Sequence, residues 1–507
     1  MTKPAKKLTV SLILRRAYTG FSLPALLLAL LTGQVAAQDN TLYLLHDIPQ
    51  ANQLNPAVIS TCRTYIELPV ISSVRLNIRN TGFGFHDAIH MGTGAQAETF
   101  YLDLDNLDRK LKRMNYFRTD LDIDLLGFGF ALSEWFFTFG IANHTELRVA
   151  YPDDIVSVRD GNWLVTEEMA NPISFNGLGI DATNWFSIGV SAARQVMEGL
   201  KAGIRVKYIQ GAANINTRNS RLELNTATSP ITLEAEMKYR LNASFPLSLG
   251  YSADGLVNNV NFEDSFSNII GDFIFNGNRG ISLDAGTIYD LDEKTQLSFS
   301  FTDLGFIWWR KNVNNFNASG KYTFSGIDLD QYQSDPDPDD FLQALEDSLM
   351  KALNAEGTSG SYVTFMSMKI FGGISREILP DLRAGAMTRF EVYDLRIRPS
   401  LTMSLNYTPV PAVEGSISYT IMNNKLNQVG AALALGNRVG QFYIITDNIP
   451  VRFTRYSGSA WMWPYNARMI SLRFGFNLLF GCKEKEEEQG SRGHRNSGTS
   501  KLCPAYW

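Results

Sequence analysis

The sequence predicts an all-β fold, a transmembrane antiparallel β-barrel of about fourteen strands. Three observations predict it. Strict alternation of apolar and polar residues recurs along the chain, a secretory signal opens it, and no apolar run after that signal is long enough for a membrane-spanning helix. A chain that enters a bilayer without such helices must close its sheet, because lipid offers no hydrogen-bond partner to an open sheet edge.

Residues 1–37 have the composition of a cleaved signal peptide. The apolar run Leu23–Leu31 is too short to span a bilayer, and small residues precede Gln38. The segment carries five cations and no acid: Lys3, Lys6, Lys7, Arg15 and Arg16. Its removal takes the formal net charge from −5 to −10. A mildly acidic, well-mixed chain has no electrostatic footprint for nucleic acid, so we expect no nucleic-acid partner.

The alternation is clearest in residues 233–245, where odd positions are apolar and even positions are polar or charged. Side chains of a strand point to opposite faces with period two, so each such segment has one apolar and one polar face. Similar segments occur near 119–132, 136–151, 185–196, 200–208, 281–291, 296–306, 316–329, 364–378, 382–393, 397–409, 414–422, 428–436, 440–447 and 469–480. Their lengths suit tilted membrane strands.

A large β-sandwich or propeller is the soluble alternative, because its strands alternate too. Charges of both signs follow one another on the polar faces, as expected for a water-filled lumen. We therefore predict that seven charged residues face the lumen: Lys201, Arg205, Lys207, Glu234, Glu236, Lys238 and Arg240. Tryptophans near strand ends predict an interfacial girdle: Trp135, Trp185, Trp308, Trp309, Trp461 and Trp463.

Four segments organise the chain. The signal peptide is followed by residues 38–99, a turn-rich stretch that predicts either a plug or hatch with the first strands, or an irregular first strand pair. Residues 100–481 form the predicted barrel, and residues 482–507 a disordered charged tail. Within the barrel, Asp335–Asp340 and the apolar stripe that follows predict a short capped helix in a long loop.

Three cysteines, Cys62, Cys482 and Cys503, are too few for a disulfide-built fold and lack the spacing of a zinc site. In an oxidising compartment Cys482 and Cys503 either pair or stay free; both alternatives are open.

Catalytic motifs bear on the function class, because a few outer-membrane barrels are enzymes. The sequence has no Gly-x-Ser-x-Gly elbow, no His-Glu-x-x-His helix and no glycine-rich phosphate loop.

His86 and His90 have metal-ligand spacing in a turn-rich stretch, which we interpret as coincidence. His144 shares a polar strand face with Glu146 and Arg148, which makes a Ser-His-acid arrangement conceivable, but lumen polarity explains it too. The acidic row Asp120, Asp122 and Asp124 predicts cross-strand ion pairs. We expect no catalytic, cofactor or metal site.

Arg473, Gly475, Leu478 and Phe480 resemble the closing-strand signal of bacterial outer-membrane barrels. In those proteins the barrel-assembly machinery binds this signal, so the resemblance implies that partner and an outer-membrane location. The signal usually ends the chain, whereas about 27 residues follow it here.

Residues 42–58 and 80–85 resemble an uncharacterised family of Bacteroidota outer-membrane barrels, and the resemblance extends from about 40 to 481. Asn55, Pro56 and Ala57 are similar to an element near the start of FadL-type fatty-acid transporters and of the secretion barrels PorV and PorP. The FadL likeness implies a hatch in the lumen and sideways passage of hydrophobic molecules through the wall.

Three function classes follow. We predict a FadL-like transporter or pore for hydrophobic or small solutes in the outer membrane. The alternative is a non-enzymatic barrel partner of a secreted protein, like PorV and PorP, and an outer-membrane hydrolase is the third. Membrane lipid, the assembly machinery, and either hydrophobic small molecules or a secreted protein are the expected partners.

Overall fold

The structure is a computed structural model. It describes residues 40–91, 100–157, 159, 172–228, 231–245, 247–251, 257–262, 277–324, 356–393, 396–410, 412–422, 426–437, 439–449, 453–455, 462–464 and 468–482. Outside these ranges lie the predicted signal peptide, the predicted loop helix and all of the predicted tail except Cys482. Among the described residues, no helix has the length and apolar character needed to cross a membrane.

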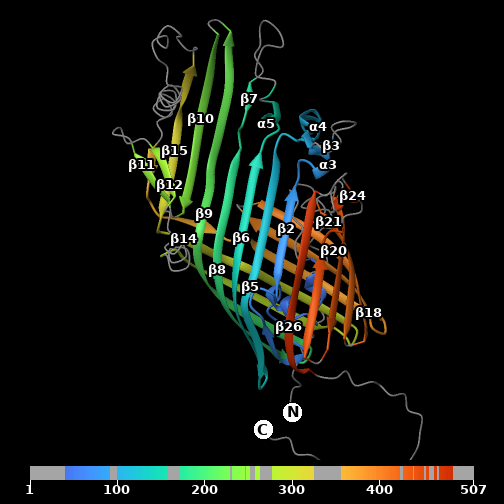
Figure 1. Ribbon diagram of the computed structural model, residues 1–507. Coiled ribbons are helices and arrows are strands. Elements are labelled where there is room, and N and C mark those ends of the chain that lie inside the picture. The colour runs from blue at the N-terminus through green and yellow to red at the C-terminus, as the bar shows by residue number, and fades with distance from the viewer. Residues whose placement is uncertain are drawn as a thin grey trace, which may run out of the picture.

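Fourteen antiparallel strand positions form a closed ring (Figure 1). β1 (Cys62–Glu67) and β2 (Val74–Asn80) share the first position, since both pair with β5 on one side and with β26 on the other. The other positions are β5 (Asn115–Leu132), β6 (Trp135–Tyr151), β8 (Gly179–Met197), β9 (Leu200–Thr228), β13 (Arg279–Asp290), β14 (Thr295–Trp309), β18 (Met368–Leu379), β19 (Leu382–Tyr393), β20 (Arg396–Val410), β21 (Val413–Met422), β22 (Leu426–Gly436), β23 (Gly440–Thr446) and β26 (Met469–Cys482). The predicted fourteen-strand barrel is confirmed.

The ring is polar inside and apolar outside. On β20, Met403, Leu405 and Tyr407 are about half exposed, whereas the alternate residues Thr402, Ser404 and Asn406 are buried. Exposed apolar side chains recur on the outer face of other strands: Ile188, Val190, Ile204, Val206, Ile417, Ile421, Leu433, Leu435, Phe442, Ile444 and Phe474. A soluble protein would bury these residues, so this pattern supports a wall that faces lipid.

A sheet extends the ring at the end that lies at the top of Figure 1, away from Cys62 and Cys482. β9 runs past its pairing with β13 and pairs with β10 (Ile231–Ser244), which pairs with β15 (Val313–Phe324). Glu234, Glu236, Lys238 and Arg240 lie on β10, outside the closed ring, and Glu236 pairs with the exposed Lys321. The prediction that these four residues face the lumen is therefore wrong, because alternation records two unlike faces of a strand and not what each face meets.

Shorter elements lie around this end. They are α3 (Phe85–Ala88), β3 (Ile89–Met91), β4 (Phe100–Leu102), α4 (Leu104–Lys110), α5 (Asp154–Ser157), β7 (Ile173–Ser174), β11 (Leu247–Tyr251), β12 (Val257–Phe262), β16 (Glu356–Thr358), β17 (Tyr362–Phe365), β24 (Phe453–Arg455) and β25 (Met462–Pro464). Asp103 caps α4 by accepting a hydrogen bond from the Asn106 backbone N–H, as an N-terminal cap does.

Residues 40–61, called the plug from here on, lie inside the ring toward the end opposite the extended sheet (Figure 1). They contain two short 3-10 helices, η1 (Leu42–Leu44) and η2 (Pro49–Gln53). The apolar plug residues form a buried cluster with inward side chains of β13, β18, β19, β22 and β23: Leu42, Tyr43, Leu44, Leu45, Ile48, Ala51, Leu54, Ala57 and Val58 with Ile288, Phe371, Met387, Ala432, Ala434, Tyr443 and Ile445. Tyr43 stacks on Phe371 with ring centroids 4.9 Å apart.

A disulfide links Cys62 on β1 to Cys482 on β26. The two cysteines lie directly opposite each other in the antiparallel register of these strands. Of the two alternatives for Cys482, pairing with Cys503 or a free thiol, neither holds, since its partner is Cys62. The bond joins the first and the last strand of the barrel.

Candidate functional site

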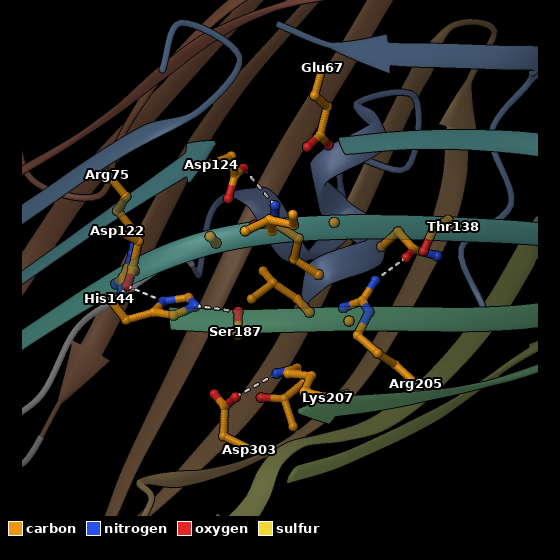
Figure 2. Close-up of a pocket in the computed structure, with 18 of the residues that line it drawn as sticks. Glu67, Arg75, Asp122, Asp124, Thr138, His144, Ser187, Arg205, Lys207 and Asp303 are labelled. Carbon is orange, nitrogen blue, oxygen red and sulfur yellow. Dashed lines mark hydrogen bonds and ion pairs between the residues drawn. The ribbon is translucent and has the colours of Figure 1, made fainter. Parts of the chain in front are cut away.

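A cavity of about 130 Å³ lies between the plug and the wall formed by the fourteen strands. Its lining comes from the plug at and just after η2 and from β5, β6, β8 and β9, with two residues each from β1 and β14 and one each from β2, β18 and β26. Figure 2 shows charged side chains reaching toward it from several strands. The cavity is therefore bounded on one side by the plug, the segment that leads into β1, and on the other side by strands of the wall.

A row of three glycines hollows the inner wall at this cavity. Gly127 on β5 faces Gly140 on β6, which faces Gly189 on β8. A Cβ at Gly127 would overlap the Glu67 carboxylate, whereas a Cβ at Gly140 would meet nothing closer than the Leu126 carbonyl oxygen at 3.8 Å. The space over these three glycines is called the recess from here on. Glu67 fills it at Gly127, and it is open at Gly140.

Three amide side chains of η2 tie the plug to charged or polar groups of the wall. Gln50 Nε2 donates to Asn477 Oδ1 at 2.6 Å and to Glu67 Oε1 at 3.2 Å. Gln53 Nε2 donates to Asp124 Oδ2 at 2.8 Å, and Asn52 accepts a hydrogen bond from Arg205. These four hydrogen bonds reach four different strands of the wall, so together they hold η2 in one orientation.

The predicted hatch motif lies at the end of the plug. Asn55 Nδ2 donates to the Thr287 carbonyl oxygen at 3.3 Å, and Asn55 Oδ1 accepts from the Ala57 backbone N–H at 3.0 Å. The Pro56 carbonyl packs directly on Gly203 of β9, where a side chain would overlap it. The motif turns the chain against the wall at a site that only glycine accommodates.

His144 of β6 forms a chain of hydrogen bonds with two neighbouring strands (Figure 2). Its Nδ1 lies 2.7 Å from Asp122 Oδ1 on β5, and its Nε2 lies 2.9 Å from Ser187 Oγ on β8. Trp185 stacks on the imidazole with centroids 5.1 Å apart. Trp185 and Trp309 are both buried, so the prediction that these two belong to an interfacial girdle is wrong. Trp185 instead lies in the interior, where its stacking orients the His144 imidazole.

The remaining predicted lumen cations separate into two places. Arg205 and Lys207 line the cavity, and Lys207 Nζ lies 2.8 Å from Asp284 and 2.6 Å from Asp303. Lys201 lies apart from them, in a shallow pocket at the β13–β14 turn near Arg383. The three aspartates of the acidic row have different partners. Asp120 forms an ion pair with Arg118, and Asp122 forms one with Arg75. Asp124 accepts a hydrogen bond from the side-chain amide of Gln53.

The predicted closing-strand signal lies on β26 as follows. Arg473 is buried in the lumen and lines the cavity. Gly475 packs against the Ser72 carbonyl, Leu478 pairs with Ile66 of β1, and Phe480 is exposed on the outer face. Its use by an assembly partner stays a prediction.

Protonation of His46, a residue of the plug, makes the stability of the docked plug depend on pH. Burial, then the nearby cations Arg383 and Lys201, lower the pKa of His46 from 6.5 to about 4. Because this docked-state pKa lies below the free value, protons favour the undocked plug. Docking is fully stable above about pH 6.5 and weakens, by up to roughly 3 kcal/mol, as the pH falls toward 4.

We expect the rate of proteolysis within the plug to rise as the pH falls from 6.5 to 4. We expect His46→Gln to remove this pH dependence of the rate. The rate of cleavage within residues 40–61, followed by mass spectrometry, measures it. Identical pH profiles for the two proteins would refute the role of His46.

Sequence reasoning missed Gln50, Gln53, Ser187 and the glycine row. Each gains its meaning from a neighbour on another strand, and no local motif marks it. Within the described ranges, no group of three or more His, Cys, Asp or Glu side chains is arranged to hold a metal ion.

Comparisons with known proteins give a family and a set of barrels. A model described as "Family of unknown function (DUF5723)" matches residues 56–447. No curated protein matches the chain.

The toluene transporter TbuX of Ralstonia pickettii is 9% identical, with 85% of this chain and 94% of that chain covered, at a TM-score of 0.40. The toluene transporter TodX of P. putida is 9% identical, with 84% and 91% covered, at 0.36. A FadL homologue of Pseudomonas aeruginosa is 10% identical, with 86% and 94% covered, at 0.34. Values this low carry no argument about function.

Proposed function

The chain belongs to the family of unknown function DUF5723, and we propose that it is an outer-membrane channel for small solutes whose lumen is gated by the plug. Membership confirms the resemblance to an uncharacterised family, while the Bacteroidota origin stays a prediction. The observation that carries the proposal is the plug itself, a separate segment that fills the lumen and leaves a polar cavity beside the wall.

The kind of contact between plug and wall supports gating over permanent filling. The plug is held by many hydrogen bonds from single side chains, including Thr41 to Asp447 at 2.7 Å and the amides of η2. No strand of the plug joins the sheet, so the plug leaves the lumen without breaking a ladder of the barrel. Polar groups uncovered by its departure meet water, whereas the buried apolar cluster of the plug would be exposed and sets the main cost of opening.

The lining of the lumen supports small polar solutes over large hydrophobic ones. Charged groups from β2, β5, β9, β14 and β18 reach the cavity, as in an aqueous pore. The sideways passage that the FadL resemblance implies requires a gap in the wall. The first strand position is interrupted between Glu67 and Val74, where Pro69, Val70 and Ile71 are exposed. Backbone hydrogen bonds from Val70 N–H to the Asp124 carbonyl and from Phe476 N–H to the Ile71 carbonyl still bridge this interruption, so it is a bulge in the wall and not an open lateral route.

Conductance in planar bilayers tests the proposal. We expect a variant lacking residues 40–58 to show stepwise ion conductance that the full mature chain lacks. The deletion spares Cys62 and the wall strands, and a variant lacking residues 483–507 is the matched control. A heat-sensitive shift in gel migration verifies that each protein is folded. A folded deletion variant that stays silent contradicts a plugged channel.

The sheet beyond the ring favours a second candidate, a barrel that binds another protein. β9, β10 and β15 extend far past the ring on the side away from the plug (Figure 1). If binding is the function, removing the plug leaves the protein silent, and shortening the hairpin between β9 and β10 abolishes capture of the partner.

A further inference from the structure

We propose that Ser187, His144 and Asp122 form a nucleophilic triad that hydrolyses small esters in the cavity beside the plug. The inference goes beyond gated passage, since a channel requires no nucleophile. It stands on the geometry of three side chains from three adjacent strands and on the open recess next to them.

The hydrogen bonds have the order that activates a serine. Asp122 Oδ1 lies 2.7 Å from His144 Nδ1, so the carboxylate accepts the Nδ1 proton and leaves Nε2 with a lone pair. Ser187 Oγ lies 2.9 Å from Nε2 and donates its proton there. This is the arrangement in which the imidazole acts as general base toward the hydroxyl. Stacking on Trp185 fixes the plane of the imidazole.

Arg75 completes the positioning of the carboxylate. It binds Asp122 Oδ2, while Asp122 Oδ1 is left for His144. Both oxygens of the carboxylate are therefore held by hydrogen-bond donors. A charged carboxylate stabilises the imidazolium that forms when His144 takes the serine proton. Asp122 and Arg75 are positioning residues, because they act through His144.

The recess supplies the space that a substrate needs. Ser187 pairs with Ala142 across the β6–β8 ladder, two residues from the facing glycines Gly140 and Gly189. Next to Gly189, the stems of Arg205 and Lys207 lie 3.5 Å from where a Cβ would be. A small acyl group over the glycines lies against these aliphatic stems, whereas the charged groups of Arg205 and Lys207 are already bound by Asn52, Asp284 and Asp303. Figure 2 shows Arg205, Lys207 and Ser187 around the same space.

The reaction balances with water as the only co-substrate. Ser187 Oγ bonds to the ester carbonyl carbon while its proton moves to His144 Nε2. The ester C–O bond breaks, and the leaving alcohol takes that proton. Water then attacks the acyl-serine, giving a proton to His144, which returns it to Ser187 Oγ as the carboxylic acid leaves.

Covalent labelling with phenylmethylsulfonyl fluoride, a small serine-directed probe, tests the proposal on the refolded full mature chain. We expect one adduct, located on Ser187 by peptide mass spectrometry, and loss of that adduct in Ser187→Ala and His144→Gln. Ser191→Ala is the matched control, because Ser191 lies on the same face of β8, is equally buried and bonds to Thr138. Its labelling should equal that of the unaltered protein.

Hydrolysis of p-nitrophenyl acetate gives a second readout that does not require the sulfonyl probe to fit. We expect turnover in the folded protein, retained in Ser191→Ala and reduced to the level of heat-unfolded protein in Ser187→Ala. Asp122→Asn should lower turnover and shift its pH profile, which a merely structural role would not do. Absence of both adduct and turnover in folded protein, or equal activity in Ser187→Ala, overturns the triad.

Discussion

Replacing Gly203 by alanine is expected to displace the plug and open the lumen without any deletion. A Cβ at this position would overlap the Pro56 carbonyl and lie 2.7 Å from the Ala57 backbone nitrogen. Both neighbours are backbone atoms, so no side-chain rotation relieves the overlap. Gly203 itself is fixed by ladders to β8 and β13, whereas the plug is held by side-chain contacts. The plug is therefore the part that moves.

Stepwise conductance in planar bilayers, together with proteolysis within residues 40–61, measures this effect. Both should rise in Gly203→Ala toward the values of the variant without a plug. Gly140→Ala is the control, since a Cβ there meets only the Leu126 carbonyl oxygen at 3.8 Å and no part of the plug. Equal conductance and proteolysis in the two alanine variants would show that the Asn55-Pro56-Ala57 turn does not close the lumen.

The wall of the barrel was predictable from the sequence because its cause is local. Lipid on one side and a polar lumen on the other impose a period of two on every strand, as Thr402 to Tyr407 show. The same period occurs in β10, which never joins the ring, because a sheet beyond the rim also has two unlike faces. Alternation thus predicted a strand at residues 233–245 and assigned its charged face to the wrong surroundings.

The site was less predictable because it depends on register. His144 lies directly opposite Asp122 in the β5–β6 ladder, and Ser187 lies two positions along β8 from Trp185, the residue opposite His144. A shift of the strand register by one residue would turn any of these side chains to the outer face. The local sequence does not determine that register. The acidic row and the position of His144 on a polar face were visible, but their partners were not. Gln50 and Gln53 lie in a segment without periodicity, so their wall partners could not be inferred.

The disulfide shows the same dependence on long-range structure. Cys62 and Cys482 are separated by 420 residues and become neighbours only when the last strand pairs with the first. Cys503 is much nearer to Cys482 along the chain, which is why proximity in sequence suggested the other pairing. Closure of the barrel, and not spacing, selects the partner.

Breaking this bond is expected to lower the stability of the barrel substantially. A cross-link that closes a loop of this length reduces the entropy of the unfolded chain by the equivalent of about 5–6 kcal/mol in the chain-entropy model. Cys62→Ser should therefore lower the urea midpoint of the refolded protein, and reduction of the unaltered protein should lower it to the same value. Cys503→Ser should leave the midpoint unchanged, because Cys482 is already paired with Cys62. Loss of stability in Cys503→Ser but not in Cys62→Ser would instead favour the local pairing and leave the closing strands joined by their hydrogen bonds alone.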